Sequence, residues 1–281
     1  MRYRAPMTDR RTAFLGGGRM GEALVAGLLR SGGRSADEIL VTARREERAR
    51  ELEERLGVAT SLDNAEACRF AGVLVLMAKP QDTEVLLGQI ADHVTPEHLV
   101  VSFAAGIRTS FVEQHLVPDV PVVRVMSNVP VMVDEAMSVI ASGRSADDKH
   151  LALTEDLLGS VGKVLRLDER YLDAVTATSG SGPAYFFLLA EAMIEACILL
   201  GLSRDVATEL IIQTMLGSAK MLRDTKVHPV ELREMVTSPG GTTIEAIRHL
   251  EEAGVRAAFL NAIDAAKRRS EELARGGDEE E

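Results

Sequence analysis

Four hydroxyl side chains surround a Pro-Gly-Gly turn in TSPGGTT, at residues 237–243, between two stretches with helical periodicity. The helix predicted to follow, TTIEAIRHL, begins directly after Gly240 and Gly241. The first amides of a helix lack intrahelical partners, and the helix dipole adds positive potential at that end. The turn therefore predicts a site for a small anion such as a carboxylate. The hydroxyls that would serve it belong to Ser238, Thr242 and Thr243.

Thr242 also has a purely structural alternative. With Glu245 three residues later it matches a capping box, which would use its hydroxyl to cap the helix. Thr243 is less easily explained in this way and remains the stronger candidate for substrate contact.

A second candidate site lies near the start of the chain. A predicted strand, TAFL, runs into a Gly-x-Gly-x-x-Gly turn at residues 16–21 and then into a predicted helix. This context is typical of a dinucleotide site, in which glycines let the backbone approach a pyrophosphate. The alternative is a Gly-rich turn without a ligand. The candidate contact residues are Leu15, Gly16, Gly17, Gly18, Arg19 and Met20.

The end of the second predicted strand, VTARR, bears on the choice of cofactor. NAD enzymes usually place an acidic residue there, whereas Thr42, Arg44 and Arg45 offer a hydroxyl and two cations. Arginines suit a 2′-phosphate, so the sequence favours NADP(H) and leaves NAD(H) open. The alternative is that both arginines merely begin a charged, solvated helix.

Two further strand ends point toward the same cofactor. Ligands of an open parallel sheet lie beyond the carboxyl ends of its strands, and small residues there leave room for a flat nicotinamide ring. Ordinary strand-to-loop turns are the alternative. The additional candidate contacts are Asn64, Ala78, Lys79, Pro80, Ala104, Ala105 and Gly106.

The chain changes character near its middle. Up to about residue 167, short β-rich runs alternate with helical patterns, which predicts a mostly parallel sheet of the Rossmann type. Beyond it every pattern is helical, and residues 183–202 are apolar on nearly every side, which calls for partner helices. We therefore expect an α/β protein with a flexible leader (1–11), a Rossmann NADP-binding domain (12–167), a helical dimerisation and substrate domain (168–275) and an acidic tail (276–281).

Composition narrows the function further. A net charge of −11 argues against nucleic acid or an anionic membrane as partner, and no window provides the roughly 18 apolar residues of a membrane span. Cys68 and Cys197 lack metal-ligand spacing, so we expect buried free thiols, no metal and a cytoplasmic location.

The chain shows no Ser-His-Asp constellation, and scattered histidines such as His228 and His249 suit surface or capping positions. Lys220 lies in a helical pattern and leaves open a hydroxy-acid substrate with a catalytic lysine. A non-catalytic NADP(H)-binding protein is the remaining alternative, although it would have no need of a second anion site.

Six motifs occur in an order that resembles the pyrroline-5-carboxylate reductase family, from residue 12 to about residue 273: GGGRMG, MAKPQ, VVSFAAG, VRVMSNVP, SGSGPAYFF and HPVELREMVTSPGGTTIEAI. The resemblance implies NAD(P)H-dependent reduction of 1-pyrroline-5-carboxylate to L-proline, the last step of proline biosynthesis. It also implies a homodimer with interlocked helical domains, a larger oligomer being left open, and a Thr243 that contacts the substrate's ring nitrogen. The departures are an N-terminal extension, the VTARR segment, and Thr178 where a hydrophobic residue is expected.

Overall fold

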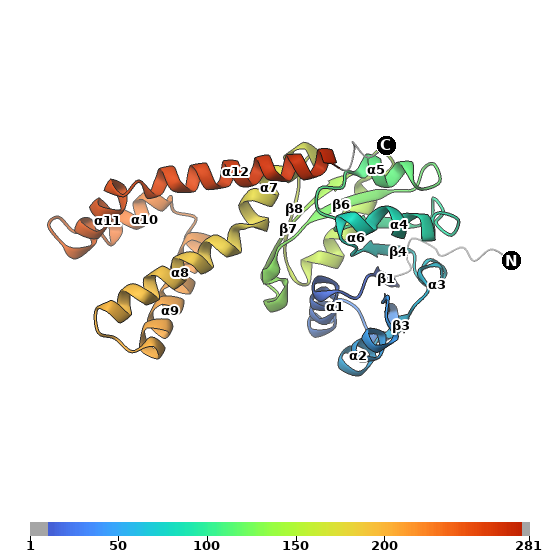
Figure 1. Cartoon of the computed structure of the whole chain (residues 1–281), viewed down its shortest axis with the longest axis horizontal. Coiled ribbons are helices and arrows are strands. Elements are labelled where there is room, and N and C mark those ends of the chain that lie inside the picture. The colour runs from blue at the N-terminus through green and yellow to red at the C-terminus, as the bar shows by residue number, and fades with distance from the viewer. Residues whose placement is uncertain (1–10, 277–281) are drawn as a thin grey trace. The chain divides into compact units, whose positions relative to one another are not determined.

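The β-rich runs of the first half form one sheet in the computed structural model, which describes residues 11–276 (Figure 1). Its strand order is β3-β2-β1-β4-β5-β6-β7-β8, and neighbouring strands are parallel except for β6 and β7. The first six strands thus have the Rossmann order, which confirms the predicted fold class. The strands are β1 Thr12–Leu15, β2 Ile39–Thr42, β3 Ala59–Ser61, β4 Val73–Leu76, β5 Leu99–Ser102, β6 Val122–Met126, β7 Ala136–Ser142 and β8 Gly162–Arg166.

Helices cover both faces of this sheet, because its central strands are apolar on both sides. Successive residues of β1 illustrate the pattern, since Phe14 packs into one core and Leu15 into the other. The first core includes α1 Arg19–Ser31, α2 Glu46–Leu56 and α6 Asp148–Gly159. The second includes α3 Asn64–Phe70, α4 Pro80–Ile90 and α5 Thr109–Gln114.

Strands β3, β7 and β8 were not predicted. β3 has only three residues, and β8 is a largely exposed edge strand, so neither carries the apolar run of a buried strand. β7 is buried and apolar but pairs with β6 in the antiparallel direction, outside the βαβ rhythm.

The segment before the long helices contains a π-helical turn at Thr176–Gly180. Asn128 is buried and anchors this turn, because its side-chain amide donates to the Ser179 carbonyl at 3.0 Å. The departure at Thr178 has a local explanation, since its hydroxyl donates to the Ala174 carbonyl at 2.8 Å. A polar side chain is therefore accommodated there without loss of a hydrogen bond.

The second half is helical, as predicted. α7 Leu172–Val175 is followed by α8 Gly182–Leu199, α9 Arg204–Thr225, α10 Pro229–Met235, α11 Thr242–Glu252 and α12 Val255–Gly276. The chain divides into two compact units, of which the second is Gly182–Ala265, whereas the predicted domain boundary lay at residue 167. Residues 168–181 and the end of α12 belong to the same unit as the sheet. Within that unit, Ser270 of α12 donates to Asp173 of α7 at 2.7 Å. The leader and tail lie outside the described residues, apart from Arg11 and Gly276.

Helix α8 presents large apolar side chains on its surface. Phe186, Phe187 and Leu188 are each more than 60% exposed. The segment Glu169–Leu199 is long and apolar enough to cross a membrane, although only 6% of its most apolar window is buried within the chain. The expectation that no window provides about 18 apolar residues did not take this segment into account, because isolated charges such as Glu191 and Glu195 interrupt its apolar run.

Candidate functional site

A cavity of 890 Å³ lies at the carboxyl ends of β1, β2 and β4, next to the point where the strand order reverses. This is where open α/β sheets bind ligands. The Gly-rich turn, the start of α2 and the start of α4 line it together. The predicted residues found in its lining are Leu15, Gly16, Gly17, Gly18, Arg19, Thr42, Arg44, Arg45, Asn64, Ala78 and Lys79.

Each glycine of the turn is required or favoured at its position for a different reason. Gly16 has a φ of +122°, which disfavours other residues. A Cβ on Gly17 would lie 2.5 Å from Leu52 Cδ1 of α2, so this position must also lack a side chain. Gly18 precedes α1 and has no side-chain cap, which leaves the positive end of that helix available to an anion. The turn therefore fits the pyrophosphate of a dinucleotide.

The predicted hydroxyl at the end of β2 is used within the protein. Thr42 is buried and donates to Asn64 Oδ1 at 2.6 Å, and the Asn64 amide donates to Gln89 Oε1 at 2.6 Å. This chain of hydrogen bonds joins β2 to α3 and α4 along one wall of the cavity. It fixes Asn64 beside the end of β2, where a ribose is expected.

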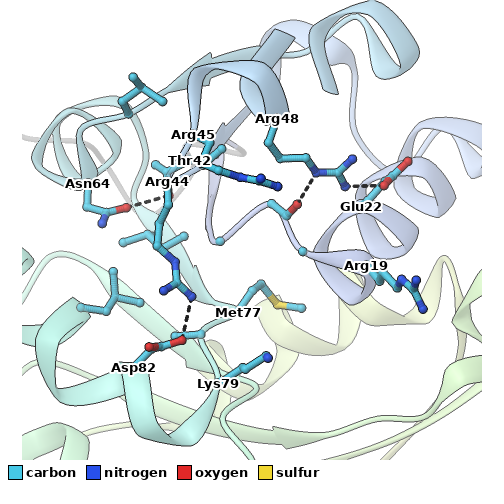
Figure 2. A pocket seen from close by; sticks show the side chains of 18 of the residues that line it. Arg19, Glu22, Thr42, Arg44, Arg45, Arg48, Asn64, Met77, Lys79 and Asp82 are labelled. Carbon is cyan, nitrogen blue, oxygen red and sulfur yellow. Dashed lines mark hydrogen bonds and ion pairs between the residues drawn. The ribbon is translucent and has the colours of Figure 1, made fainter. Parts of the chain in front are cut away.

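The arginines of the VTARR segment differ in their surroundings (Figure 2). Arg44 is 79% exposed and reaches Asp82 of α4 at 2.7 Å. Arg45 is exposed at the N-cap of α2, and within the described part of the chain it has no carboxylate partner. Arg45 is therefore the more available cation for a 2′-phosphate.

A partly buried ion pair between Arg48 and Glu22, with exposed partners at Glu51 and Arg55, lies beside the turn and was missed by sequence reasoning. Arg48 donates to Glu22 at 2.5 Å (Figure 2). It also donates to Glu51 at 2.9 Å, and Arg55 reaches Glu22 at 2.7 Å. The hydrogen bond to Glu22 raises the pKa of the Arg48 guanidinium, while partial burial opposes this shift. The only available signal was the spacing of Arg48 and Leu52, which places both on one face of α2.

Five predicted cofactor residues do not line this cavity. Met20 packs against the first core, and Pro80 occupies the first turn of α4. Ala104 is buried in the second core beyond the end of β5, with Ala105 and Gly106 after it. The contact of Ala104, Ala105 and Gly106 with a nicotinamide ring stays a prediction.

The TSPGGTT segment forms a tight turn between α10 and α11. Gly240 has a φ of +69°, and the Gly241 amide donates to the Ser238 carbonyl at 3.1 Å. Gly241 is the N-cap of α11 and provides no side-chain cap. The capping-box alternative for Thr242 is therefore wrong, because Thr242 is already inside the helix. The hydroxyl of Thr237 is used locally, since it donates to the Arg233 carbonyl at 2.6 Å.

The remaining reactive side chains have structural surroundings. His228 caps α10 by accepting from the Val230 amide at 3.3 Å, as expected of a capping histidine. Burial raises the pKa of the Cys68 thiol to about 12, so this cysteine is protonated at neutral pH. Cys197 is half-buried, contrary to expectation, because α8 exposes most of its surface. Within residues 11–276, no cluster of His, Cys, Asp and Glu is arranged to hold a metal ion.

Comparisons with known proteins match both parts of the chain. A model described as pyrroline-5-carboxylate reductase dimerisation matches residues 169–273, and one described as NADP oxidoreductase coenzyme F420-dependent matches residues 11–106. Among solved structures, a pyrroline-5-carboxylate reductase from Coxiella burnetii has a TM-score of 0.89 at 36% identity, covering 95% of this chain and 99% of that one. A Plasmodium falciparum pyrroline carboxylate reductase with NADP bound has a TM-score of 0.86 at 25% identity, covering 96% and 100%.

Two relatives extend the match over nearly the full length. The pyrroline-5-carboxylate reductase of Methanosarcina acetivorans is 42% identical over 267 residues, which cover 95% of this chain and 99% of the relative. That of Corynebacterium melassecola is 45% identical over 264 residues, covering 93% and 97%. With this identity, and with both the dinucleotide cavity and the helical unit matched, the chain belongs to the pyrroline-5-carboxylate reductase family.

Proposed function

We propose that this chain reduces 1-pyrroline-5-carboxylate to L-proline with NADPH, the last step of proline biosynthesis in the cytoplasm. The observation that carries the proposal is 42–45% sequence identity, over nearly the whole chain, to reductases of that name, together with a cavity suited to a dinucleotide. An uncapped helix start at Gly18 and an unpaired cation at Arg45 fit the pyrophosphate and the 2′-phosphate.

The TSPGGTT turn supports a site for the substrate carboxylate. Gly241 leaves the first amides of α11 without a side-chain partner, so the helix offers donors and positive potential to an anion. Gly240 has a φ of +69°, which favours glycine at this position of the turn, and a Cβ on Gly241 would lie 2.4 Å from the Ser238 hydroxyl. We assign carboxylate binding to Ser238, Gly240, Gly241 and Thr242, and the hydrogen bond to the ring nitrogen to Thr243.

The proposed reaction needs little general acid-base catalysis by side chains. When bound, NADPH would supply a hydride to the carbon of the protonated imine, which gives the neutral amine without a further proton. The protein orients the imine, and holding reactants in alignment provides effective molarities of about 10⁵ M or more. The Thr243 hydroxyl stabilises the nitrogen as the imine becomes an amine, which suits the absence of a Ser-His-Asp arrangement in the sequence.

The activity is tested by NADPH oxidation with 1-pyrroline-5-carboxylate and a panel of small keto acids. We expect rapid, saturable oxidation with the imine and little with the keto acids. Keto-acid reduction that depends on Lys220 would favour a hydroxy-acid enzyme instead. Cofactor binding without turnover of any substrate would indicate a non-catalytic protein.

We also propose that the active enzyme is a homodimer with interlocked helical domains. The exposed side chains of α8 would be buried by the partner, and the dimerisation model matches this region. The TSPGGTT turn of one subunit would then complete the site over the partner's cofactor. We expect light scattering at assay concentration to show a dimer or a larger oligomer, and a fully active monomer would contradict this proposal.

A further inference from the structure

We propose that Arg48 is a positioning residue for the cofactor, which holds the Gly-rich turn in its binding shape through the Gly17 carbonyl. The guanidinium Nε of Arg48 donates to that carbonyl at 2.9 Å (Figure 2). This inference rests on the proposed use of NADP(H), and it assigns a role to a residue outside the fingerprint itself.

The geometry links this bond to the anion site. The carbonyl of Gly17 and the amide of Gly18 belong to one peptide plane, and a trans peptide points them in opposite directions. A hydrogen bond that fixes the Gly17 carbonyl therefore also fixes the direction of the Gly18 amide at the start of α1. The preceding peptide is held as well, because the Gly17 amide donates to the Thr42 carbonyl at 2.7 Å.

Arg48 is itself held in place from both sides. Its side chain is 21% exposed and that of Glu22 is 15% exposed, so their ion pair is shielded from water. Glu51 takes a second guanidinium nitrogen at 2.9 Å. Removing Arg48 would leave Glu22 beside the pyrophosphate site with only Arg55, and would free the turn to adopt other conformations.

The face of α2 that carries Arg48 also carries Leu52, which explains why the turn needs the hydrogen bond from Arg48. Leu52, one helical turn after Arg48, lies where a Cβ of Gly17 would be. The glycine that permits this close approach is also the most flexible kind of residue, and a glycine loses the most conformational freedom when it becomes ordered. A pre-formed turn binds its ligand without this cost.

The test compares Arg48→Met with Arg50→Met, a control that removes an exposed arginine of the same helix whose partner is Glu46. Binding of NADPH and of NADH is measured by nicotinamide fluorescence on the full chain without substrate, followed by steady-state kinetics. Because the pyrophosphate is common to both cofactors, we expect Arg48→Met to raise both Kd values in parallel, by about tenfold. We expect kcat at saturating cofactor to change less than about twofold, because Arg48 does not touch the reacting atoms.

Arg48→Lys should restore part of the affinity, because an ammonium can replace one hydrogen bond but not the planar fork. If Arg48→Met does not fold, Arg48→Lys provides the comparison of Kd values instead. Unchanged Kd values with a lower melting temperature would overturn the inference in favour of a purely structural role. A loss confined to NADPH would overturn it too, because Arg48 would then contact the 2′-phosphate. If the unmodified protein binds neither cofactor, the proposed function fails; if it binds them and Arg48→Met matches it, only this inference fails.

Discussion

Replacing Arg44 and Arg45 together by glutamine weakens NADPH binding far more than NADH binding. The two cofactors differ only in the 2′-phosphate, and each charged hydrogen bond lost to it costs about 1.5 to 3 kcal/mol. One such contact corresponds to at least about a tenfold rise in the Kd of NADPH. The measurement is a titration of each cofactor followed by nicotinamide fluorescence.

The two single variants should lose different amounts of NADPH affinity. Arg44 already pairs with Asp82, which competes with a phosphate for its charge, and an exposed ion pair of this kind is worth about 0.2 to 1 kcal/mol. Arg45 has no such competitor, so Arg45→Gln should cost more than Arg44→Gln. A charge-matched control replaces Arg50 and Arg69, exposed arginines that do not line the cavity. Equal losses for NADPH and NADH would contradict the assignment.

The parts of the site that sequence reasoning found have local signals. The Gly-rich turn lies between a strand and a helix that are adjacent in the chain, so periodicity and glycine spacing are sufficient to place it. The ends of β2 and β4 follow from the same alternation, and the sheet order brings them to one cavity.

The parts that were missed depend on contacts between distant residues. Glu22 and Arg48 are 26 positions apart, and neither has a spacing that predicts their ion pair. Asp82 lies 38 positions from Arg44, so its competition for that arginine was equally hidden. The capping box failed for a different reason: the Thr-x-x-Glu pattern is present, but Gly241 takes the N-cap position and Glu245 pairs with Arg248 instead.

Thr243→Ala should lower the maximal rate of imine reduction while leaving cofactor affinity nearly unchanged. If its hydroxyl bonds the ring nitrogen mainly as charge on that atom changes, the bond is stronger in the transition state than in the ground state. Its loss costs on the order of 1 to 3 kcal/mol, or about tenfold to a hundredfold in rate. Cofactor contacts are assigned to the separate Rossmann unit, which explains why cofactor affinity should be spared.

Three further variants separate this role from a structural one. Thr243→Val keeps the shape of the side chain without the hydroxyl, so its rate should match that of Thr243→Ala, whereas Thr243→Ser should recover much of the rate. Thr242→Ala is the matched neighbour, and because Gly241 rather than Thr242 caps α11, we expect it to change the melting temperature little. Saturation kinetics and melting temperatures are measured on all four. Near-normal turnover by Thr243→Val would remove this hydroxyl from the mechanism, because only a bond to the reacting nitrogen makes the rate depend on it.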